Sequence, residues 1–422
     1  MGYCADARNL FCVDLFFALT GIASARKIFH IDIGQGGDDT AVRMSSMSRS
    51  LWIFLLAVAT LSVGAEAALA GQFKRPAYYG AGQRPYKVVT AQFTKTGNSD
   101  LAVADYLTDR VIILLGNGDG TFQEPINFAA PAPIALAAGD FNEDGNQDLA
   151  VVESGGTGDG AVAIYLGDGN GGFKLSASYA IGVASISLTV ADFNGDGHLD
   201  VAVTNKGFNN PGNMMTFFGD GHGKLRGRKT YKTADAPFGI AAADLNGDHH
   251  PDLVVANLGG YVSVFLNDGT GSFLKPVKYA WNGTPLDVKI ADLRNNGQQD
   301  LVVADGADGM VVFLNKGNGT FGKPTIYPPT CQDCVAPMAC VVADFNLDNK
   351  LDVACATNID DSYLFYGKGN GKFGPSIPIN NTIKFQGGFC IAAGNFITNN
   401  KAPDLAIPIE EYGKVAILLN NQ

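Results

Sequence analysis

Carboxylate and amide side chains stand at alternate positions of a nine-residue pattern, DxNxDGxxD, which occurs in four copies, two of them without the glycine. Positions one, three, five and nine would supply side-chain oxygens and position seven a backbone carbonyl, and Ca²⁺ prefers such an oxygen cage. Asp and Asn also form ordinary turns, in which they hydrogen-bond to their own backbone. Because each copy places three carboxylates within nine residues, where they would repel one another, the pattern favours calcium over a simple turn.

The predicted metal ligands form four groups, each running from position one to position nine. They are Asp140, Asn142, Asp144, Asn146 and Asp148; Asp192, Asn194, Asp196, His198 and Asp200; Asp244, Asn246, Asp248, His250 and Asp252; and Asp344, Asn346, Asp348, Lys350 and Asp352. Glycine at position six suits the left-handed conformation of a sharp turn, and His249 and Asn349 replace it in the last two groups. We therefore expect about four structural calcium ions.

Three further copies of the pattern depart from it. The first begins at Gln92, the fifth carries Arg294 at position three, and the seventh begins at Asn395 and contains an extra residue. Each keeps the closing aspartate, but the first and seventh have no carboxylate at the other ligand positions, and the fifth has only Asp292, at position one. We expect these three loops to hold no metal.

The seven copies recur at a nearly constant interval. Their closing aspartates are Asp100, Asp148, Asp200, Asp252, Asp300, Asp352 and Asp404, which lie 48 or 52 residues apart. Within each repeat, apolar runs and turn residues predict four short strands, the first leading into the acidic loop and the second following it. Such repeats are typical of propeller blades, because a ring of blades covers the apolar faces that one blade leaves open.

The two ends of the repeat region distinguish a closed ring from an open solenoid. The seventh repeat stops at Gln422 after its third strand, whereas residues 72–79, QFKRPAYY, match the fourth strand of a repeat. An orphan first strand and a missing last strand would complete one blade together. We therefore predict an all-β fold, a seven-bladed β-propeller of four-stranded antiparallel blades over residues 71–422, closed by an N-terminal strand.

The repeat, in copies such as ADFNGDGHLDVAV from Ala191 and ADLNGDHHPDLVVAN from Ala243, resembles the FG-GAP or VCBS repeat family, which includes the propellers of integrin α-subunits. The resemblance covers nearly all of residues 71–422 and implies a β-propeller with calcium in its loops. Members of this family serve in adhesion, in carbohydrate binding and as accessory modules of extracellular enzymes. A helical EF-hand is disfavoured, because the loops lack Glu at position twelve and lead into β-branched strands.

The segment at residues 44–70 has the layout of a secretory signal peptide. Arg49 precedes an apolar run from Leu51 to Val63, and small residues follow up to Ala70. The run is shorter than the roughly 20 residues that span a bilayer, so we expect cleavage near Gly71 and no stable membrane span. Residues 1–43 are a doubtful leader, because the true start is expected at Met44 or Met47. The predicted location is extracellular or periplasmic.

Charge and motifs argue against two classes of function, nucleic-acid binding and catalysis. The formal net charge is −11, and no cluster of Lys and Arg is expected, which argues against a nucleic-acid partner. The chain contains neither GxSxG nor HExxH, so we expect no enzyme, although an acid pair for cleaving polysaccharides stays open.

The mature region contains five cysteines: Cys331, Cys334, Cys340, Cys355 and Cys390. No histidine nearby completes a zinc site, so a local disulfide is expected in an exported protein. The pairing stays open, and an odd count leaves at least one thiol unpaired or intermolecular.

Three functions fit this chain. The first is an extracellular binding or adhesion module for a protein or a glycan, with calcium as a structural element. The second is a lectin with sugar pockets repeated between blades, and the third is a polysaccharide-degrading lyase or hydrolase. The connections opposite the acidic loops vary most in length and are the expected binding face, with aromatic candidates at Tyr106, Phe208, Tyr261, Trp281, Phe385 and Tyr412.

Overall fold

The computed structural model describes residues 72–154, 160–182, 184–207, 212–233, 236–330, 337–357, 362–379 and 388–422. These residues belong to one compact unit, Gly71–Gln422. Every regular element in the described part of the chain is a β-strand, which confirms the all-β prediction. The predicted signal peptide and the residues before it lie outside the described residues. No helix among the described residues is long and apolar enough to cross a membrane.

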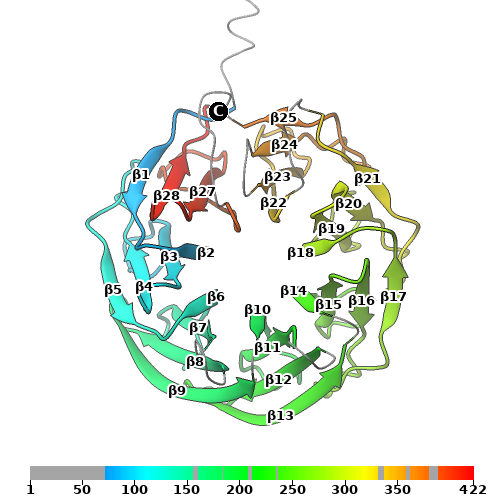
Figure 1. Cartoon of the computed structure of the whole chain (residues 1–422), viewed down its shortest axis with the longest axis horizontal. Coiled ribbons are helices and arrows are strands. Elements are labelled where there is room, and N and C mark those ends of the chain that lie inside the picture. Colours follow the sequence, from blue (N-terminus) through cyan, green and yellow to red (C-terminus); the bar gives the residue numbers. More distant parts are fainter. Residues whose placement is uncertain are drawn as a thin grey trace, which may run out of the picture. The chain divides into compact units, whose positions relative to one another are not determined.

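The strands form seven four-stranded antiparallel sheets arranged as the blades of a ring (Figure 1). Blade 1 contains β2 (Pro85–Ala91), β3 (Asp100–Asp105), β4 (Arg110–Leu114) and β5 (Ile126–Ala129). Blade 2 contains β6 (Pro133–Gly139), β7 (Asp148–Glu153), β8 (Gly160–Gly167) and β9 (Phe173–Gly182). Blade 3 contains β10 (Ser185–Ala191), β11 (Asp200–Asn205), β12 (Asn213–Gly219) and β13 (Leu225–Lys232). Blade 4 contains β14 (Pro237–Ala243), β15 (Asp252–Asn257), β16 (Tyr261–Phe265) and β17 (Val277–Ala280).

The remaining blades follow the same order. Blade 5 contains β18 (Pro285–Ala291), β19 (Asp300–Asp305), β20 (Gly309–Phe313) and β21 (Thr325–Tyr327). Blade 6 contains β22 (Ala339–Ala343), β23 (Asp352–Ala356), β24 (Tyr363–Phe365) and β25 (Ile377–Pro378). Blade 7 contains β26 (Ala392–Gly394), β27 (Asp404–Ile409), β28 (Lys414–Leu418) and, as its outer strand, β1 (Ala77–Gly80).

The ring closes through the N-terminal strand, as predicted. β1 pairs antiparallel with β28, with Ala77 opposite Ile417, and an isolated bridge joins Phe73 to Asn420. Blade 7 therefore combines strands from both ends of the repeat region. This pairing confirms a seven-bladed propeller and excludes the open solenoid.

The apolar core is divided among the contacts between neighbouring blades. Seven clusters of buried side chains each join two adjacent blades, such as Val103 of blade 1 with Val415 of blade 7. The second strand of each blade is buried along its described length, which explains its nearly continuous apolar sequence. Each blade is therefore stabilised mainly by its two neighbours.

A local disulfide is present, as expected, and joins Cys340 to Cys355 across β22 and β23. Cys390 is a buried free thiol. Cys331 and Cys334 lie outside the described residues.

Candidate functional site

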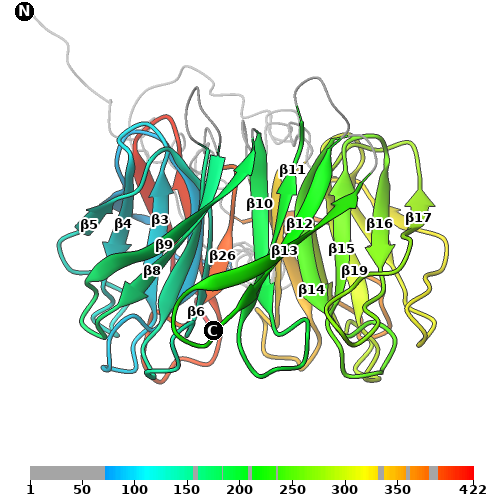
Figure 2. The same ribbon diagram turned by 90° about the horizontal axis from the view of Figure 1, so that it is seen from below.

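The seven repeat loops connect the first and second strands of the blades on one face of the ring, at the lower edge of Figure 2. Position six has the left-handed backbone that the sequence predicted, with φ of 82° at Gly145, 88° at Gly197, 67° at His249 and 63° at Asn349. The second strands end and the third strands begin on the opposite, upper face.

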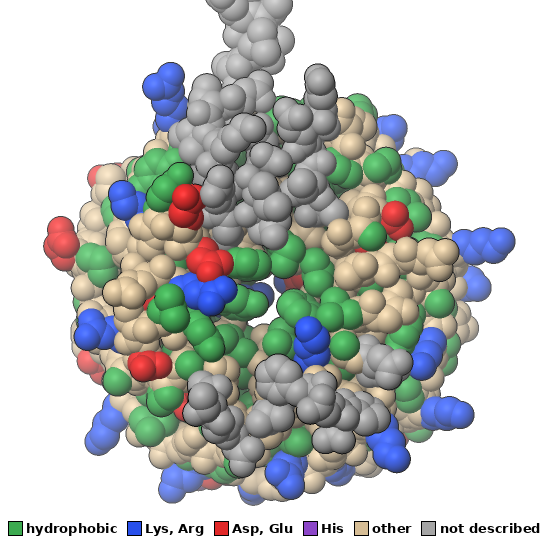
Figure 3. All heavy atoms as spheres, viewed as in Figure 1, with side chains coloured by type: hydrophobic (Ala, Val, Ile, Leu, Met, Phe, Trp, Pro, Cys, Tyr) green, Lys and Arg blue, Asp and Glu red, His purple; other side chains and the backbone are tan. Residues whose placement is uncertain are grey.

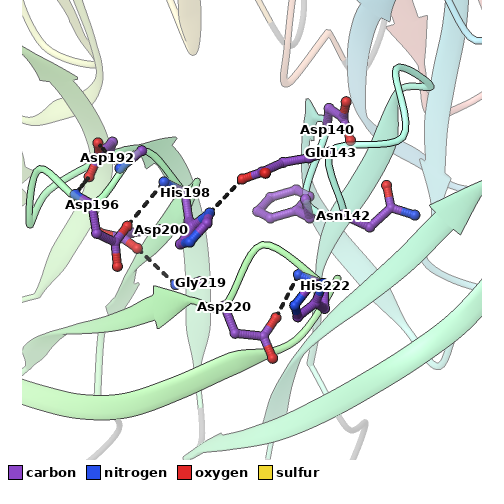
Figure 4. A network of polar contacts seen from close by, with 12 residues as sticks. Asp140, Asn142, Glu143, Asp192, Asp196, His198, Asp200, Gly219, Asp220 and His222 are labelled. Atoms are coloured by element: carbon purple, nitrogen blue, oxygen red, sulfur yellow. Dashed lines mark hydrogen bonds and ion pairs between the residues drawn. The ribbon is translucent and has the colours of Figure 1, made fainter.

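The loop of blade 3 shows how the ligand residues are arranged (Figure 4). Asp192 accepts backbone N–H groups from Asp196 (3.2 Å) and Gly197 (2.8 Å), so its carboxylate lies at the centre of the loop. Asp196 in turn accepts the N–H of His198 at 3.0 Å. The loops beginning at Asp140, Asp244 and Asp344 contain the corresponding bonds to position six. The predicted ligand residues therefore occupy equivalent places in all four blades.

The closing aspartate has a structural role that the sequence analysis missed. Asp200 is fully buried, and its two oxygens accept the N–H of Phe193 at 2.9 Å and of Gly219 at 2.8 Å. The carboxylate thereby ties the acidic loop to the end of the third strand. The same pair of bonds occurs at Asp100 and Asp404, whose loops were predicted to be metal-free. Presence of the aspartate in all seven copies was the available signal.

Burial raises the pKa of most of the closing aspartates. It raises the pKa of Asp200 to about 6, and repulsion from Asp196 and Asp192 acts in the same direction. Asp148, Asp252 and Asp352 have pKa values raised to about 6 for the same reasons. Burial also raises the pKa of Asp100 and Asp404. Ionisation of the closing aspartate is therefore less favourable in the four acidic loops than in a free side chain, and a bound cation would favour it.

The donor atoms of the four acidic loops are of the kind that calcium requires. In the described part of the chain, no group of three or more His, Cys, Asp and Glu side chains is placed to hold a metal ion as it stands. Each acidic loop nevertheless offers only oxygen donors, and a carboxylate oxygen that accepts one N–H retains a second lone pair. The chemistry of the residues therefore fits calcium, and binding would require the aspartates at positions one and five to turn toward the ion.

Blade 5 carries a cation of its own. The Arg294 guanidinium forms an ion pair with the buried Asp300 at 2.7 Å and donates to the carbonyl oxygen of Asn315 at 2.7 Å. It also reaches the side-chain oxygen of Gln298 at 3.0 Å. Arginine at position three thus neutralises the carboxylate that ends this loop.

Replacing Arg294 with Met is expected to destabilise the protein by about 3 kcal/mol, because it leaves the Asp300 carboxylate buried without its partner. Urea denaturation would measure the change in the free energy of unfolding. Arg294→Lys, which keeps a positive charge, serves as the control and should lose less. An unchanged unfolding midpoint for Arg294→Met would show that the ion pair contributes nothing.

Neighbouring loops touch through positions four and seven. Glu143 at position four of blade 2 contacts the ring nitrogen of His198, at position seven of blade 3, at 2.5 Å (Figure 4). This hydrogen bond raises the pKa of His198. Thr398 of blade 7 likewise donates to Asn98 of blade 1 at 3.1 Å. These contacts depend on how blades pack, so a repeat alignment alone does not reveal them.

A polar cavity of about 450 Å³ lies where the loop of blade 1 meets blade 2. Its lining includes Thr90, Gln92, Lys95, Asn146 and Gln147. Thr90 Oγ1 and Asn146 Oδ1 are buried and have no hydrogen-bond partner among the described residues. The cavity therefore offers unused hydrogen-bonding capacity.

A ring of seven large apolar side chains surrounds the upper mouth of the central channel. Each blade contributes one residue near the start of its innermost strand, which in blades 6 and 7 precedes the strand by one and three residues: Tyr86, Ile134, Ile186, Phe238, Leu286, Met338 and Phe389. We call these residues the channel ring. All except Ile134 are partly exposed, and Figure 3 shows hydrophobic side chains around the central opening. Asp287, which forms an ion pair with Lys289, also lines this mouth. Arg84, which precedes Tyr86 by two residues, forms an ion pair with Glu410.

The aromatic candidates divide between packing and exposure. Trp281 donates its indole N–H to Asp305 at 2.6 Å and packs against Phe313, so its role is structural. Tyr412 is 54% exposed. Tyr106 and Tyr261 each lie under a cation, from Arg84 and Lys278. Phe208 and Phe385 lie outside the described residues.

Positive charge gathers on the outer wall of the ring, where Figure 3 shows Lys and Arg at the rim. The segment of β13 and the residue before it carry Lys224, Arg226, Arg228, Lys229 and Lys232 with no acidic residue. The expectation that Lys and Arg do not cluster is therefore wrong for this strand. Net charge hid the cluster, because the aspartates are concentrated in the loops while the cations lie on outer strands.

A family model described as FG-GAP-like repeat matches residues 92–151, 140–203, 192–255, 244–303 and 292–355. No curated protein matches the chain.

Several solved structures are similar in fold. A lectin from Burkholderia pseudomallei, BP39L, is 17% identical with a TM-score of 0.61, covering 80% of this chain and 96% of the lectin. An Agrocybe aegerita lectin that recognises non-reducing terminal N-acetylglucosamine is 20% identical with a TM-score of 0.54, covering 80% and 86%. BBS1N, solved in complex with ARL6DN, is 13% identical with a TM-score of 0.57, covering 83% and 98%.

At these identities the structural similarity establishes the propeller fold alone. The repeat matches are more specific, because each one spans two successive acidic loops and the strands between them. Together they run from residue 92 to residue 355, more than half of the sequence, and the chain therefore belongs to the FG-GAP-like repeat family.

Proposed function

We propose that this chain is a secreted, calcium-binding β-propeller that acts as an extracellular binding or adhesion module for a protein or a glycan. The channel ring carries the binding part of this proposal. Seven apolar side chains converge on one mouth of the channel, and six of them stay partly exposed. Exposed apolar patches on a rigid scaffold mark interaction sites, because leaving them in water is costly.

Calcium has a structural role in this proposal. The residues at positions one, three, five and nine of blades 2, 3, 4 and 6 would hold it with side-chain oxygens, and position seven with its carbonyl. Burial, and to a lesser extent repulsion from neighbouring aspartates, raises the pKa of the closing aspartates, and a bound cation would favour their ionised form. The four loops on the lower face would then keep the upper face rigid.

Export is the next part of the proposal, and it predicts a mature protein that begins near Gly71. Signal peptidase removes the segment that precedes a small-residue site, here Ala68 to Ala70. Intact mass spectrometry of the protein recovered from outside the expressing cell would measure the start. A mass that includes residues 44–70 would contradict cleavage.

A lectin is the second candidate, and the polar cavity between blades 1 and 2 favours it. Its two unpaired polar atoms, Thr90 Oγ1 and Asn146 Oδ1, suit a ligand rich in hydroxyl groups. The volume of about 450 Å³ falls in the range of small-molecule sites. We propose no catalytic activity for either candidate.

Glycan and protein arrays would separate the two candidates. If the channel ring binds, Phe238→Ser with Leu286→Ser should reduce capture about tenfold or more, since a buried apolar contact is worth about 1.5–3 kcal/mol. Thr90→Val, which removes the hydroxyl while preserving shape, should leave that capture unchanged. If Thr90→Val alone abolishes sugar binding, the lectin reading holds. Release of product from a polysaccharide panel would contradict both and favour an enzyme.

A further inference from the structure

The outer strand of blade 3, β13, differs from the rest of this acidic protein. It carries five cations within nine residues, counting Lys224, whereas the chain as a whole has a formal net charge of −11. The outer segments of the other blades are also basic but sparse, with exposed lysines such as Lys174, Lys323 and Lys372. β13 is thus the one described outer strand with a dense row of cations.

Three of the five cations are free to meet a ligand. Arg226 forms an ion pair with Asp196 at 3.3 Å, and Lys229 donates to Ser272 of blade 4 at 2.7 Å. Lys224, Arg228 and Lys232 are exposed and form no ion pair within the described residues. Arg228 and Lys232 lie on β13, which is about 26 Å long at about 3.3 Å for each of its eight residues, and Lys224 directly precedes it.

The backbone of β13 is poorly suited to pairing with another strand. The register against β12 shifts between Phe217 and Phe218, which leaves Gly227 as an extra residue with φ of 56°. Such a bulge twists an edge strand and disfavours the addition of another strand. A partner at this edge would therefore contact the side chains rather than extend the sheet.

We infer that β13 is a docking strip for a linear acidic polysaccharide, whose anionic groups pair with Lys224, Arg228 and Lys232. This inference rests on the proposed extracellular function, because linear acidic polysaccharides are polyanions that an exported protein can meet outside the cell. Arginine suits carboxylates in particular, because its planar guanidinium can donate two parallel hydrogen bonds to one of them.

The strand is less suited to the other common polyanions. Single-stranded nucleic acid is held by exposed aromatic rings that stack on its bases, but Tyr231, the one aromatic residue of β13, packs against Phe273 at 5.5 Å and accepts its N–H. An anionic membrane would need exposed apolar side chains to insert, and Leu225, the one large aliphatic residue of the strand, is buried. A linear polymer requires only the row of cations.

Direct binding of short oligogalacturonides to the full-length mature protein tests the inference. The matched neutral probe is the methyl-esterified form of the same oligomer. Lys224→Gln, Arg228→Gln and Lys232→Gln together should weaken binding about tenfold, at about 0.5 kcal/mol for each exposed ion pair. Lys174→Gln, Lys323→Gln and Lys372→Gln together change the net charge equally and should weaken binding less than about twofold.

The inference is overturned if both triple variants lose binding equally, if neither loses it, or if the methyl ester binds as well as the acid. Tighter binding of single-stranded DNA or of anionic vesicles would assign the strip to those ligands instead. Should the first triple variant melt at a lower temperature, Arg228→Gln alone, with Arg228→Lys as the charge-conserving rescue, gives the same decision. Array capture through the channel ring and the effect of calcium on melting test the proposed function separately.

Discussion

Removal of calcium by a chelator is expected to lower the melting temperature by about 10 °C or more, starting from a buffer with about 2 mM free calcium. With a dissociation constant of about 10⁻⁴ M, each occupied loop contributes about 1.8 kcal/mol. Four loops would contribute about 7 kcal/mol, comparable with the whole stability of many domains. Scanning calorimetry with and without chelator would measure the shift.

Single substitutions would show which loops bind calcium. Asp196→Ala should remove about one ion from the metal content, whereas Asp292→Ala, in the blade that carries Arg294, should remove none. Arg294→Asn combined with Asn296→Asp completes the pattern in blade 5 and should add one ion. Fewer than two ions per chain at millimolar calcium, or a melt that chelator leaves unchanged, would mean that the acidic loops are turns without metal.

Deletion of residues 73–79 is expected to lower the melting temperature by about 10 °C or more, independently of calcium. The deletion removes most of β1, exposes the edge of β28 and empties the space that Phe73 fills against Phe345 at 5.8 Å. Loss of a buried phenylalanine alone costs about 3–5 kcal/mol. Thermal unfolding of the shortened protein would measure the loss.

Phe73→Ala is the milder companion to that deletion, because it keeps the strand and removes only the ring. Its melting temperature should lie between that of the mature protein and that of the deletion variant. A deletion variant that melts with the mature protein would show that β1 does not close the ring in solution.

The periodic features of this fold could be predicted from sequence. The spacing of the closing aspartates implied seven equivalent units, and QFKRPAYY at residues 72–79 implied the shared blade. Position six of the loops was predictable because a sharp turn restricts the backbone there. Each of these features depends on residues close together in one repeat, or on comparing one repeat with the next.

Features that arise between repeats could not be predicted in the same way. The contact of Glu143 with His198 joins two blades, and the cavity beside Thr90 is formed where the loop of blade 1 meets blade 2. Arg294 was recognisable as a departure from the metal pattern, but its ion pair with Asp300 requires the folded loop. The channel ring becomes visible only when seven strand starts are brought to one axis.

The shared blade also constrains how the protein is made. β1 leaves the ribosome before any other strand of the ring, whereas its partner β28 is the last strand of the ring to be synthesised. The early blades can pack on one another as they emerge, but β1 has no partner until the last strand of the ring has emerged. Each new chain therefore passes through an interval in which an apolar end with Phe73 is exposed, and chaperones that shield such segments would act during that interval.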